Sequence, residues 1–291
     1  MDIGPVSYWR HPLTTIVSHR SVVSVIRRDG QVAFLRENVD TICRMLKLLR
    51  EPCGLPGIAY CLGQSTQDVW PVLKLLVDQE AVLCVGDMDL RQENIRVETW
   101  NGSVRLKEMV FGISGTIQAS TILRLASMLK GRFAAEVNIV LTPTATRFLR
   151  PEVASYLGLP VWSDVFEVRG EVNVPHIHLA QKADLVVIMP ASATTIHRLA
   201  TGACTDLLSR TVAATRAPIL IAPAMNPVMW TYPPIDRNIE QLRTDGMYIV
   251  EPGMGVEVSN IAARELKFCG IGLWESNIMT TLEAVLNSAT S

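Results

Sequence analysis

Two short apolar runs stand out in the second half of the chain, at residues 185–189 (LVVIM) and 219–222 (ILIA), and a proline follows each of them. Continuous apolar runs bounded by turn residues are typical of strands that are buried on both faces of a parallel sheet. After the first run, Ser192 can cap a helix over residues 196–208. The loop between them is therefore expected where a strand ends and a helix begins, which is where open α/β sheets bind ligands.

The same alternation of strands and helices occurs earlier in the chain. Residues 109–113 are expected to form a strand and residues 117–129 a helix, and residues 137–141 a second strand that ends at Thr142. The first strand leads into the turn GISG (residues 112–115), in which glycine lets the backbone approach a phosphate. This pattern predicts an α/β fold with a doubly wound, Rossmann-like parallel sheet.

The first ninety residues follow a different pattern. Residues 20–36 alternate apolar and polar side chains around Arg28-Asp29-Gly30, which indicates a β-hairpin. Three helices are expected next: one capped by Asn38, one near residues 58–62, and one capped by Ser65. A strand at residues 81–85 follows them. A hairpin, three helices and a final strand in this order predict a small winged-helix-like α+β domain.

These patterns divide the chain into three parts. A winged-helix-like domain is expected at residues 1–88, a polar linker at residues 89–107, and the α/β domain at residues 108–291. A length of 291 residues suits one large domain or two ordinary ones.

Composition narrows the classes of function. The chain is 48% hydrophobic with a formal net charge of −1, so it lacks the basic surface expected of a nucleic-acid-binding protein. No apolar run approaches transmembrane length, and the first residues do not resemble a signal peptide, so a cytoplasmic protein without a membrane partner is expected. Six cysteines without a CxxC pair predict neither a zinc site nor a dense disulfide framework.

Four motifs carry a resemblance to a known family. They are GISG at residues 112–115, HIHL at 176–179, PASATT at 190–195 and PAMNPVMW at 223–230. Together they resemble the homo-oligomeric flavin-containing cysteine decarboxylases, which include phosphopantothenoylcysteine decarboxylase and the peptidyl-cysteine decarboxylases of lanthipeptide pathways. This resemblance covers residues 108–285. The element order of residues 18–88 is similar to that of the PqqD-type domains, which hold the leader peptides of ribosomally made natural products.

The resemblance implies an FMN cofactor, a set of site residues and an oligomeric state. His176 corresponds to the active-site base, a role that suits a side chain titrating near neutral pH. Asn226 corresponds to the asparagine whose amide donates to the substrate carboxylate. A homo-oligomer, a trimer or a multiple of trimers, is implied as well. The residues expected to contact or flank FMN are Gly112, Ser114, Gly115, Thr142, Phe148, Pro190, Ala191, Ser192, Ala193 and Met225.

The sequence departs from the family pattern at two further site residues. Thr194 stands where the PASANT motif has asparagine, and a hydroxyl offers one donor where the amide offers two. Cys269 is followed by glycine but not by the aspartate of the family's CGD segment, whose cysteine helps to reduce the product. Cys269 is thus either a proton donor to the product or a buried thiol.

The function implied is FMN-dependent oxidative decarboxylation of a C-terminal cysteine in a precursor peptide, which yields an enethiol. Residues 18–88 would bind the leader by strand addition along the hairpin at residues 22–35. If so, deletion of residues 1–105 is expected to leave a folded, flavin-binding core. The alternatives are phosphopantothenoylcysteine decarboxylase itself, a flavin reductase or prenyltransferase on a related fold, and a non-catalytic flavin-binding regulatory subunit.

Overall fold

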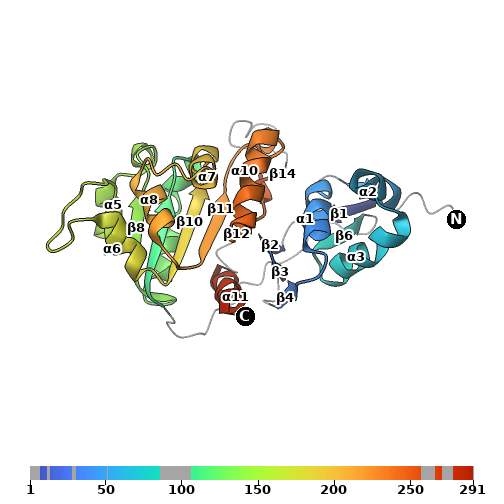
Figure 1. Cartoon of the computed structure of the whole chain (residues 1–291), viewed down its shortest axis with the longest axis horizontal. Coiled ribbons are helices and arrows are strands. Elements are labelled where there is room, and N and C mark those ends of the chain that lie inside the picture. The colour runs from blue at the N-terminus through green and yellow to red at the C-terminus, as the bar shows by residue number, and fades with distance from the viewer. Residues whose placement is uncertain are drawn as a thin grey trace.

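A nine-stranded sheet runs through the protein (Figure 1), whose computed structural model describes residues 7–11, 14–27, 31–50, 52–85, 106–256, 266–270 and 278–290. Six strands belong to its parallel part: β7 (Leu106–Ile113), β8 (Ala134–Leu141), β9 (Val161–Trp162), β10 (Leu185–Ala191), β11 (Ile219–Pro223) and β12 (Tyr248–Val250). Their order is β12-β11-β10-β7-β8-β9, and every neighbouring pair is parallel. The doubly wound sheet expected from the sequence is confirmed. Its strand order reverses between β7 and β10, and such switch points are where ligands bind.

Helices cover both faces of this parallel part. Met109, Phe111 and Ile113 of β7 pack on one face with α4 (Leu123–Leu129) and with the C-terminal helix α11 (Ile278–Thr290). Val110 and the opposite face pack against α6 (Pro175–Lys182), α7 (Ala193–Ala200), α8 (Leu207–Ala214) and α10 (Pro233–Thr244). All seven residues of β10 are buried, as expected for a central strand covered on both faces.

Two of the expected helices are interrupted. The helix expected over residues 196–208 is α7 followed by α8, because Gly202, with a φ of 69°, ends the first. Asp206 then begins α8 with a capping box, in which its side chain accepts from the Ser209 N–H and its own N–H is bound by the Ser209 hydroxyl. The helix expected over residues 117–129 is a short 3₁₀ turn, η1 (Ile117–Ser120), followed by α4.

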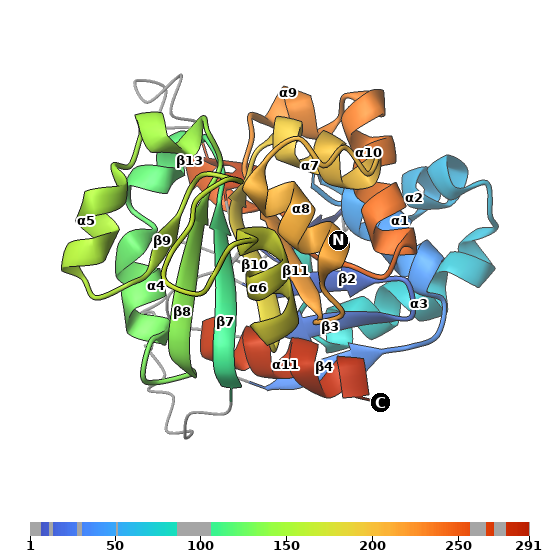
Figure 2. The same cartoon turned by 60° about the vertical axis from the view of Figure 1, so that its left-hand side comes forward.

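The N-terminal hairpin forms, but it extends the main sheet. β3 (Val22–Ile26) and β4 (Val32–Leu35) pair as expected, while the turn at residues 28–30 lies outside the described residues. β2 (Thr15–His19), which the sequence analysis missed, joins β3 to β12 in antiparallel pairing. All five residues of β3 are buried because α1 (Val39–Leu48) lies against one face and α11 against the other, which Figure 2 shows. The alternating pattern had suggested one exposed face.

The rest of the N-terminal segment forms a second, smaller layer. α1, α2 (Leu55–Leu62) and α3 (Thr66–Asp78) match the three expected helices, and Ser65 caps α3 by accepting from the Asp68 N–H. The cap expected at Asn38 is wrong in detail: Asn38 precedes α1, but its side chain makes no capping hydrogen bond because the residue is left-handed, with a φ of 53°. β6 (Val82–Val85) is the expected final strand, but it pairs with β1 (Ser7–Arg10), which also pairs with β5 (Cys53–Gly54). A winged-helix domain is not confirmed, because the hairpin and β6 lie in different sheets. The expected linker falls largely on residues 86–105, outside the described residues, so the domain boundaries stay predictions.

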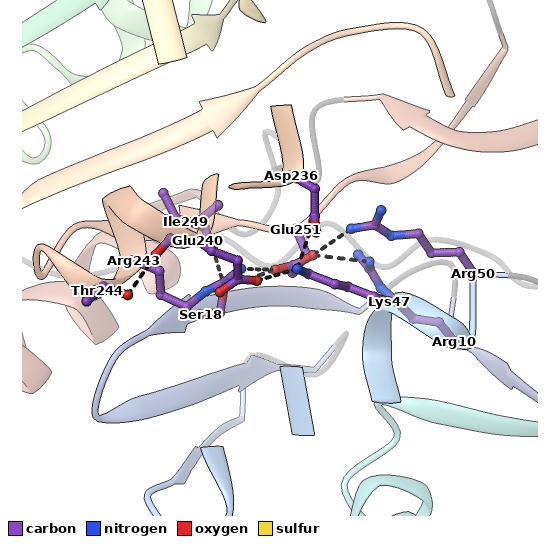
Figure 3. Close-up of polar contacts among 10 residues, drawn as sticks. All are labelled: Arg10, Ser18, Lys47, Arg50, Asp236, Glu240, Arg243, Thr244, Ile249 and Glu251. Carbon is purple, nitrogen blue, oxygen red and sulfur yellow. Dashed lines mark hydrogen bonds and ion pairs between the residues drawn. The ribbon is translucent and has the colours of Figure 1, made fainter. Parts of the chain in front are cut away.

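A buried carboxylate joins the two parts of the protein (Figure 3). Glu251 follows β12 and accepts from Arg243 Nη2 at 2.9 Å, from Arg50 Nη2 at 3.0 Å and from the Ser18 hydroxyl at 2.9 Å. Arg10 Nη1 lies 3.9 Å from the same carboxylate. Burial alone would raise the pKa of Glu251, but the three arginines lower it to about 2. This cluster, the Glu251 cluster, fixes β1, β2 and the segment that follows α1 against the parallel part of the sheet.

No helix in the described ranges has the length and apolar character needed to cross a membrane.

Candidate functional site

The loops that follow β7, β8, β10 and β11 meet at one edge of the sheet. Backbone hydrogen bonds join them in sequence: Thr142 N to Ile113 O at 3.0 Å, Ser114 N to Pro190 O at 3.1 Å, and Ala224 N to Ala191 O at 2.9 Å. The GISG turn and the PASATT loop therefore lie side by side at the switch point between β7 and β10. The structure brings together three of the four motifs that the sequence analysis selected, GISG, PASATT and PAMNPVMW.

Ser114 ties the two central loops to each other. Its hydroxyl donates to the Pro190 carbonyl at 2.8 Å and accepts from the Ser192 N–H at 2.7 Å, and the residue is fully buried. The single hydroxyl proton of Ser114 is therefore already donated to the Pro190 carbonyl. Ser114 would act on a bound ligand by holding the PASATT loop in place, and a direct contact between Ser114 and FMN stays a prediction.

Two features of the turn bear on phosphate binding, the glycine at residue 115 and the hydroxyl of Thr116. A Cβ atom on Gly115 would lie 2.4 Å from Cγ2 and 3.0 Å from the backbone carbon of Thr144, so only glycine permits this close approach of the two loops. The hydroxyl oxygen of Thr116 is buried and has no hydrogen-bond partner among the described residues. A buried polar group of this kind normally has a partner, and a phosphate oxygen would provide one. The turn therefore fits the phosphate of a mononucleotide.

The PASATT loop leads directly into α7. The Ser192 hydroxyl caps this helix by accepting from the Thr195 N–H at 3.3 Å, as the sequence predicts. Ala191 is buried, Ala193 is half-buried and Thr194 is exposed in the first helical turn. The side chain that replaces the family's asparagine therefore faces outward and is accessible.

Asn226 occupies the same edge of the sheet, after β11. Its Oδ1 accepts from the Val228 N–H at 2.7 Å and caps the single-turn helix α9 (Pro227–Trp230). Because the oxygen is fixed by a backbone donor, the NH₂ end of the carboxamide has a defined orientation. Met225, just before it, is half-buried and packs against the core on the α6–α10 side of the sheet.

His176 is the second residue of α6. This helix leads into β10 and runs antiparallel to it, so its first turn lies at the carboxyl edge of the sheet with the motif loops. Nδ1 of His176 is buried and, within the part of the chain that the structure describes, has no hydrogen-bond partner. Burial and the nearby positive charge of Arg210 lower the pKa of His176 below its ordinary value of 6.5. The imidazole is therefore neutral at pH 7 and able to accept a proton.

Replacement of Arg210 by glutamine is expected to raise the pKa of His176, because a positive charge near the imidazole is removed. If neutral His176 is the base, activity is lost as pH falls through this pKa. The acid limb of kcat/KM should lie below pH 6.5 in the native enzyme and move to higher pH in Arg210→Gln. A pH–rate profile for both proteins measures the shift; coincident limbs would rule out this coupling.

The remaining candidates lie at different places. Phe148 is exposed beyond η2 (Ala145–Arg147), at the end of β8, and the buried Thr142 precedes this turn. Gly112 is packed against Leu208, where a Cβ would lie 2.5 Å from the leucine side chain. Cys269 belongs to β14 (Leu266–Gly270), which pairs with β13 (Gly253–Val256), but its side chain lies outside the described residues. The role of Cys269 stays a prediction.

Sequence reasoning missed two contributors to the site. Thr144 packs so closely against residue 115 that only glycine fits there, and the positive charge of Arg210 helps to lower the pKa of His176. Neither stands in one of the four motifs. Arg210 also falls just beyond the single helix expected over residues 196–208, so its place in the first half of α8 was not visible from the pattern.

A parallel sheet with a glycine turn at its switch point defines a mononucleotide-binding protein of the doubly wound α/β class. The chain belongs to the Flavoprotein family, whose model matches residues 99–266, more than half of the chain.

Curated relatives match the same part of the chain. The coenzyme A biosynthesis bifunctional protein CoaBC of Mycobacterium tuberculosis is 39% identical over 153 residues, which cover 51% of this chain and 35% of that protein. The CoaBC protein of Haemophilus influenzae is 38% identical over 152 residues, covering 52% of this chain and 38% of that protein. The match thus spans well under half the length of these relatives.

Solved structures with a similar fold match this chain over almost their whole length. The FMN-dependent cysteine decarboxylase SpaF has a TM-score of 0.52 at 26% identity, covering 64% of this chain and 98% of that chain. A PPC decarboxylase variant complexed with pantothenoylaminoethenethiol has a TM-score of 0.55 at 25% identity, covering 63% and 100%. MrsD from a Bacillus species has a TM-score of 0.52 at 28% identity, covering 62% and 96%.

Proposed function

We propose that this protein is an FMN-dependent cysteine decarboxylase. The observation that carries the proposal is the pairing of GISG and PASATT through Ser114 at the switch point of the sheet. His176 and Asn226 lie at the same edge. The similarity to CoaBC proteins and to FMN-dependent cysteine decarboxylases supports the same activity.

The residues of the GISG turn would hold FMN by its phosphate. Thr116 offers the unsatisfied hydroxyl, and the start of η1 lies immediately after it. Bound FMN supplies a two-electron oxidant for the substrate thiol. The chain itself supplies the base, the carboxylate ligand and the position of the substrate.

The reaction assigns a step to each of these groups. Neutral His176 would accept the thiol proton, and the two-electron oxidation that FMN would supply, held at the GISG turn, would convert –CH₂–SH into –CH=S. The amide of Asn226 holds the carboxylate in the meantime. The C–CO₂ bond then breaks, and its electron pair moves into the C=S group to give an enethiolate. Protonation of the sulfur gives the enethiol.

We expect the protein to purify with non-covalent FMN and a yellow colour. Gly115→Ala should lose most of the flavin, because the added methyl group would collide with Thr144 and push the two loops apart. The flavin content per chain, read from the visible absorbance, measures the effect. Gly131→Ala is a suitable control, since a Cβ there meets no neighbouring atom, although its φ of 76° costs about 1 kcal/mol of stability. Equal flavin in Gly115→Ala and in the native protein would contradict the assignment of this turn.

We favour a peptide with a C-terminal cysteine as substrate. The chain carries an N-terminal segment in addition to the part that matches the family. β4, which belongs to this segment, is the edge strand of the main sheet. Of the hairpin expected to bind a leader, β3 is already paired on both sides, by β2 and β4. Strand addition would therefore use the outer edge of β4.

A second candidate substrate is phosphopantothenoylcysteine. The identity of 38–39% to CoaBC proteins favours it, since those proteins belong by name to coenzyme A biosynthesis. This candidate gives no role to the outer edge of β4. A net decarboxylation would also need a group that returns electrons and a proton to the product, for which Cys269 is the candidate.

Mass spectrometry of the products separates these candidates. Purified protein is incubated with peptides ending in cysteine and, separately, with phosphopantothenoylcysteine. Loss of CO₂ together with two hydrogens from a peptide supports the proposal, and loss of CO₂ alone from phosphopantothenoylcysteine supports the second candidate. If flavin-loaded protein changes neither substrate, the decarboxylase proposal is wrong and a regulatory subunit becomes the better explanation.

We also propose that the protein self-associates. Several large apolar side chains are exposed between η2 and the first turn of α6: Phe148, Val153, Tyr156, Leu157, Phe166, Val168, Val174 and Ile177. Apolar and aromatic enrichment of this kind is typical of the core of a protein interface. Light scattering should give a homo-oligomer, with a trimer or a multiple of trimers expected from the family. Phe166→Asp should shift it toward the monomer, and an active native monomer would refute the proposal.

A further inference from the structure

Arg50 connects the N-terminal segment to the candidate site. It follows the end of α1, where its carbonyl accepts from the Trp9 indole N–H at 3.1 Å. Its guanidinium carbon lies 5.0 Å from the centroid of the Trp230 ring, and its Nη2 donates to Glu251 at 3.0 Å. A guanidinium that lies over an indole ring and is paired with a carboxylate is held by two contacts at once.

Trp230 in turn fixes the position of Asn226. The two residues are the last residue and the cap of the same helical turn, α9, and the Trp230 N–H donates to the Asn226 carbonyl at 3.3 Å. The indole is buried, and none of the residues in the described ranges forms a hydrogen bond with its Nε1. The ring is therefore held by packing and by the Arg50 guanidinium, without a hydrogen bond of its own.

Arg10 reaches a second element next to the site. Its Nη2 donates to the Pro252 carbonyl, and the following residue, Gly253, begins β13. β13 pairs with β14, and β14 lies against α9. Arg10 thus contacts the residue just before β13, and Arg50 contacts the last residue of α9. β14 lies next to both β13 and α9. The two arginines also surround the carboxylate of Glu251 (Figure 3).

We propose that Arg50 is a positioning residue for substrate binding. By holding Trp230, and with Arg10 holding Pro252, it sets the orientation of α9 and so of the Asn226 amide that receives the substrate carboxylate. The role of Asn226 rests on the proposed function, whereas the mechanical link from Arg50 to α9 does not. The N-terminal segment accordingly helps to fix the orientation of α9 and Asn226, even for a substrate that does not contact this segment.

Lys47 provides a matched control at the same interface. It lies three residues before Arg50 and pairs with Asp236 and Glu240 of α10. It therefore joins the same two parts of the protein with the same charge, but its partners belong to neither α9 nor β13. A change caused only by looser docking of the N-terminal segment would occur in Lys47 and Arg50 variants alike.

The test compares Arg50→Gln, Arg50→Lys and Lys47→Met in the full-length protein by hydrogen–deuterium exchange. We expect Arg50→Gln to speed exchange at the amides of residues 228–230 and 253–256, with the amides of β10 unchanged. Arg50→Lys keeps the charge but loses the planar stack, so it should show a smaller increase. Lys47→Met should leave these amides as in the native protein. Unchanged exchange in Arg50→Gln, or an equal rise in Lys47→Met, would overturn the proposal.

Kinetics with a short cysteine-ending peptide that lacks a leader give the second measurement. Arg50→Gln should raise KM by roughly two- to thirty-fold with a much smaller change in kcat, because coupling through packed elements is of this size. Lys47→Met should not raise it. If no cysteine substrate is turned over even by the native protein, the proposed function fails, and the exchange experiment still decides whether Arg50 positions α9. Faster exchange in Arg50→Gln with an unchanged KM would overturn the link to substrate binding.

Discussion

Replacement of His176 by asparagine is expected to lower turnover by about a hundred- to ten-thousand-fold, the usual contribution of a positioned general base. Asparagine is similar in size and polar, but it cannot accept the thiol proton. His176 belongs to the first turn of α6 and not to the GISG turn that would hold the phosphate, so the variant should keep its flavin. Turnover of a cysteine-ending peptide and the visible flavin absorbance, measured on the same sample, test both halves of this expectation.

Two other histidines serve as controls for His176. His178 lies two positions beyond His176 on the same helix, with its ring 6.1 Å from that of Trp162, and His197 is exposed on α7. Neither belongs to the matched position of a motif. Asparagine at either position should leave most of the activity. If His176→Asn worked at nearly the native rate, or if His178→Asn lost as much as His176→Asn, the assignment of the base would be wrong.

The parallel part of the sheet could be predicted because its signals are local. The run at residues 185–189 is apolar throughout, and in the structure β10 is buried on both faces, so sequence and environment agree residue by residue. The same holds for β11 and for the cap of α7 at Ser192. The motif loops could be placed together because parallel strands all end at one edge of the sheet.

The attachment of the N-terminal segment could not be predicted, because it depends on pairs far apart in the chain. Val17 lies opposite Val250 in the β2–β12 pair, and nothing in the sequence around either residue indicates the other. Ser24 looks like the polar face of a hairpin, yet it is buried. The reason is α11, a helix from the opposite end of the chain, which covers that side of β3.

The candidate site shows the same division between local and distant information. The motifs correctly identified the loops at the switch point, but not how each side chain is used. The hydroxyl of Ser114 seemed available for a phosphate, whereas it joins two loops that are 76 residues apart. The structure also argues against a freely folding core at residues 108–291, since removal of residues 1–105 would strip β2 from β12 and two arginines from Glu251.

The second large effect is expected at Glu251. Replacement by glutamine should reduce the free energy of unfolding by about 3–5 kcal/mol, the usual result of removing one partner from a buried charge cluster. Glutamine preserves the shape and the hydrogen bond from Ser18, but it leaves Arg10 and Arg243 buried, each at most 5% exposed, without their carboxylate. Urea denaturation of the native and variant proteins at pH 7 measures the difference.

The pH dependence of this difference provides a sharper test than its size at pH 7. The pKa of Glu251 is lowered from 4.5 to about 2 in the folded protein, so its stabilising effect is complete above pH 4.5 and is lost as pH falls toward 2. The gap between native protein and Glu251→Gln should therefore narrow across this range. Glu240→Gln is the control: its carboxylate contacts Arg243 and Lys47 but is partly exposed, so its replacement should change stability by less than about 1 kcal/mol. Equal losses in the two variants would show that Glu251 is not the centre of the interface.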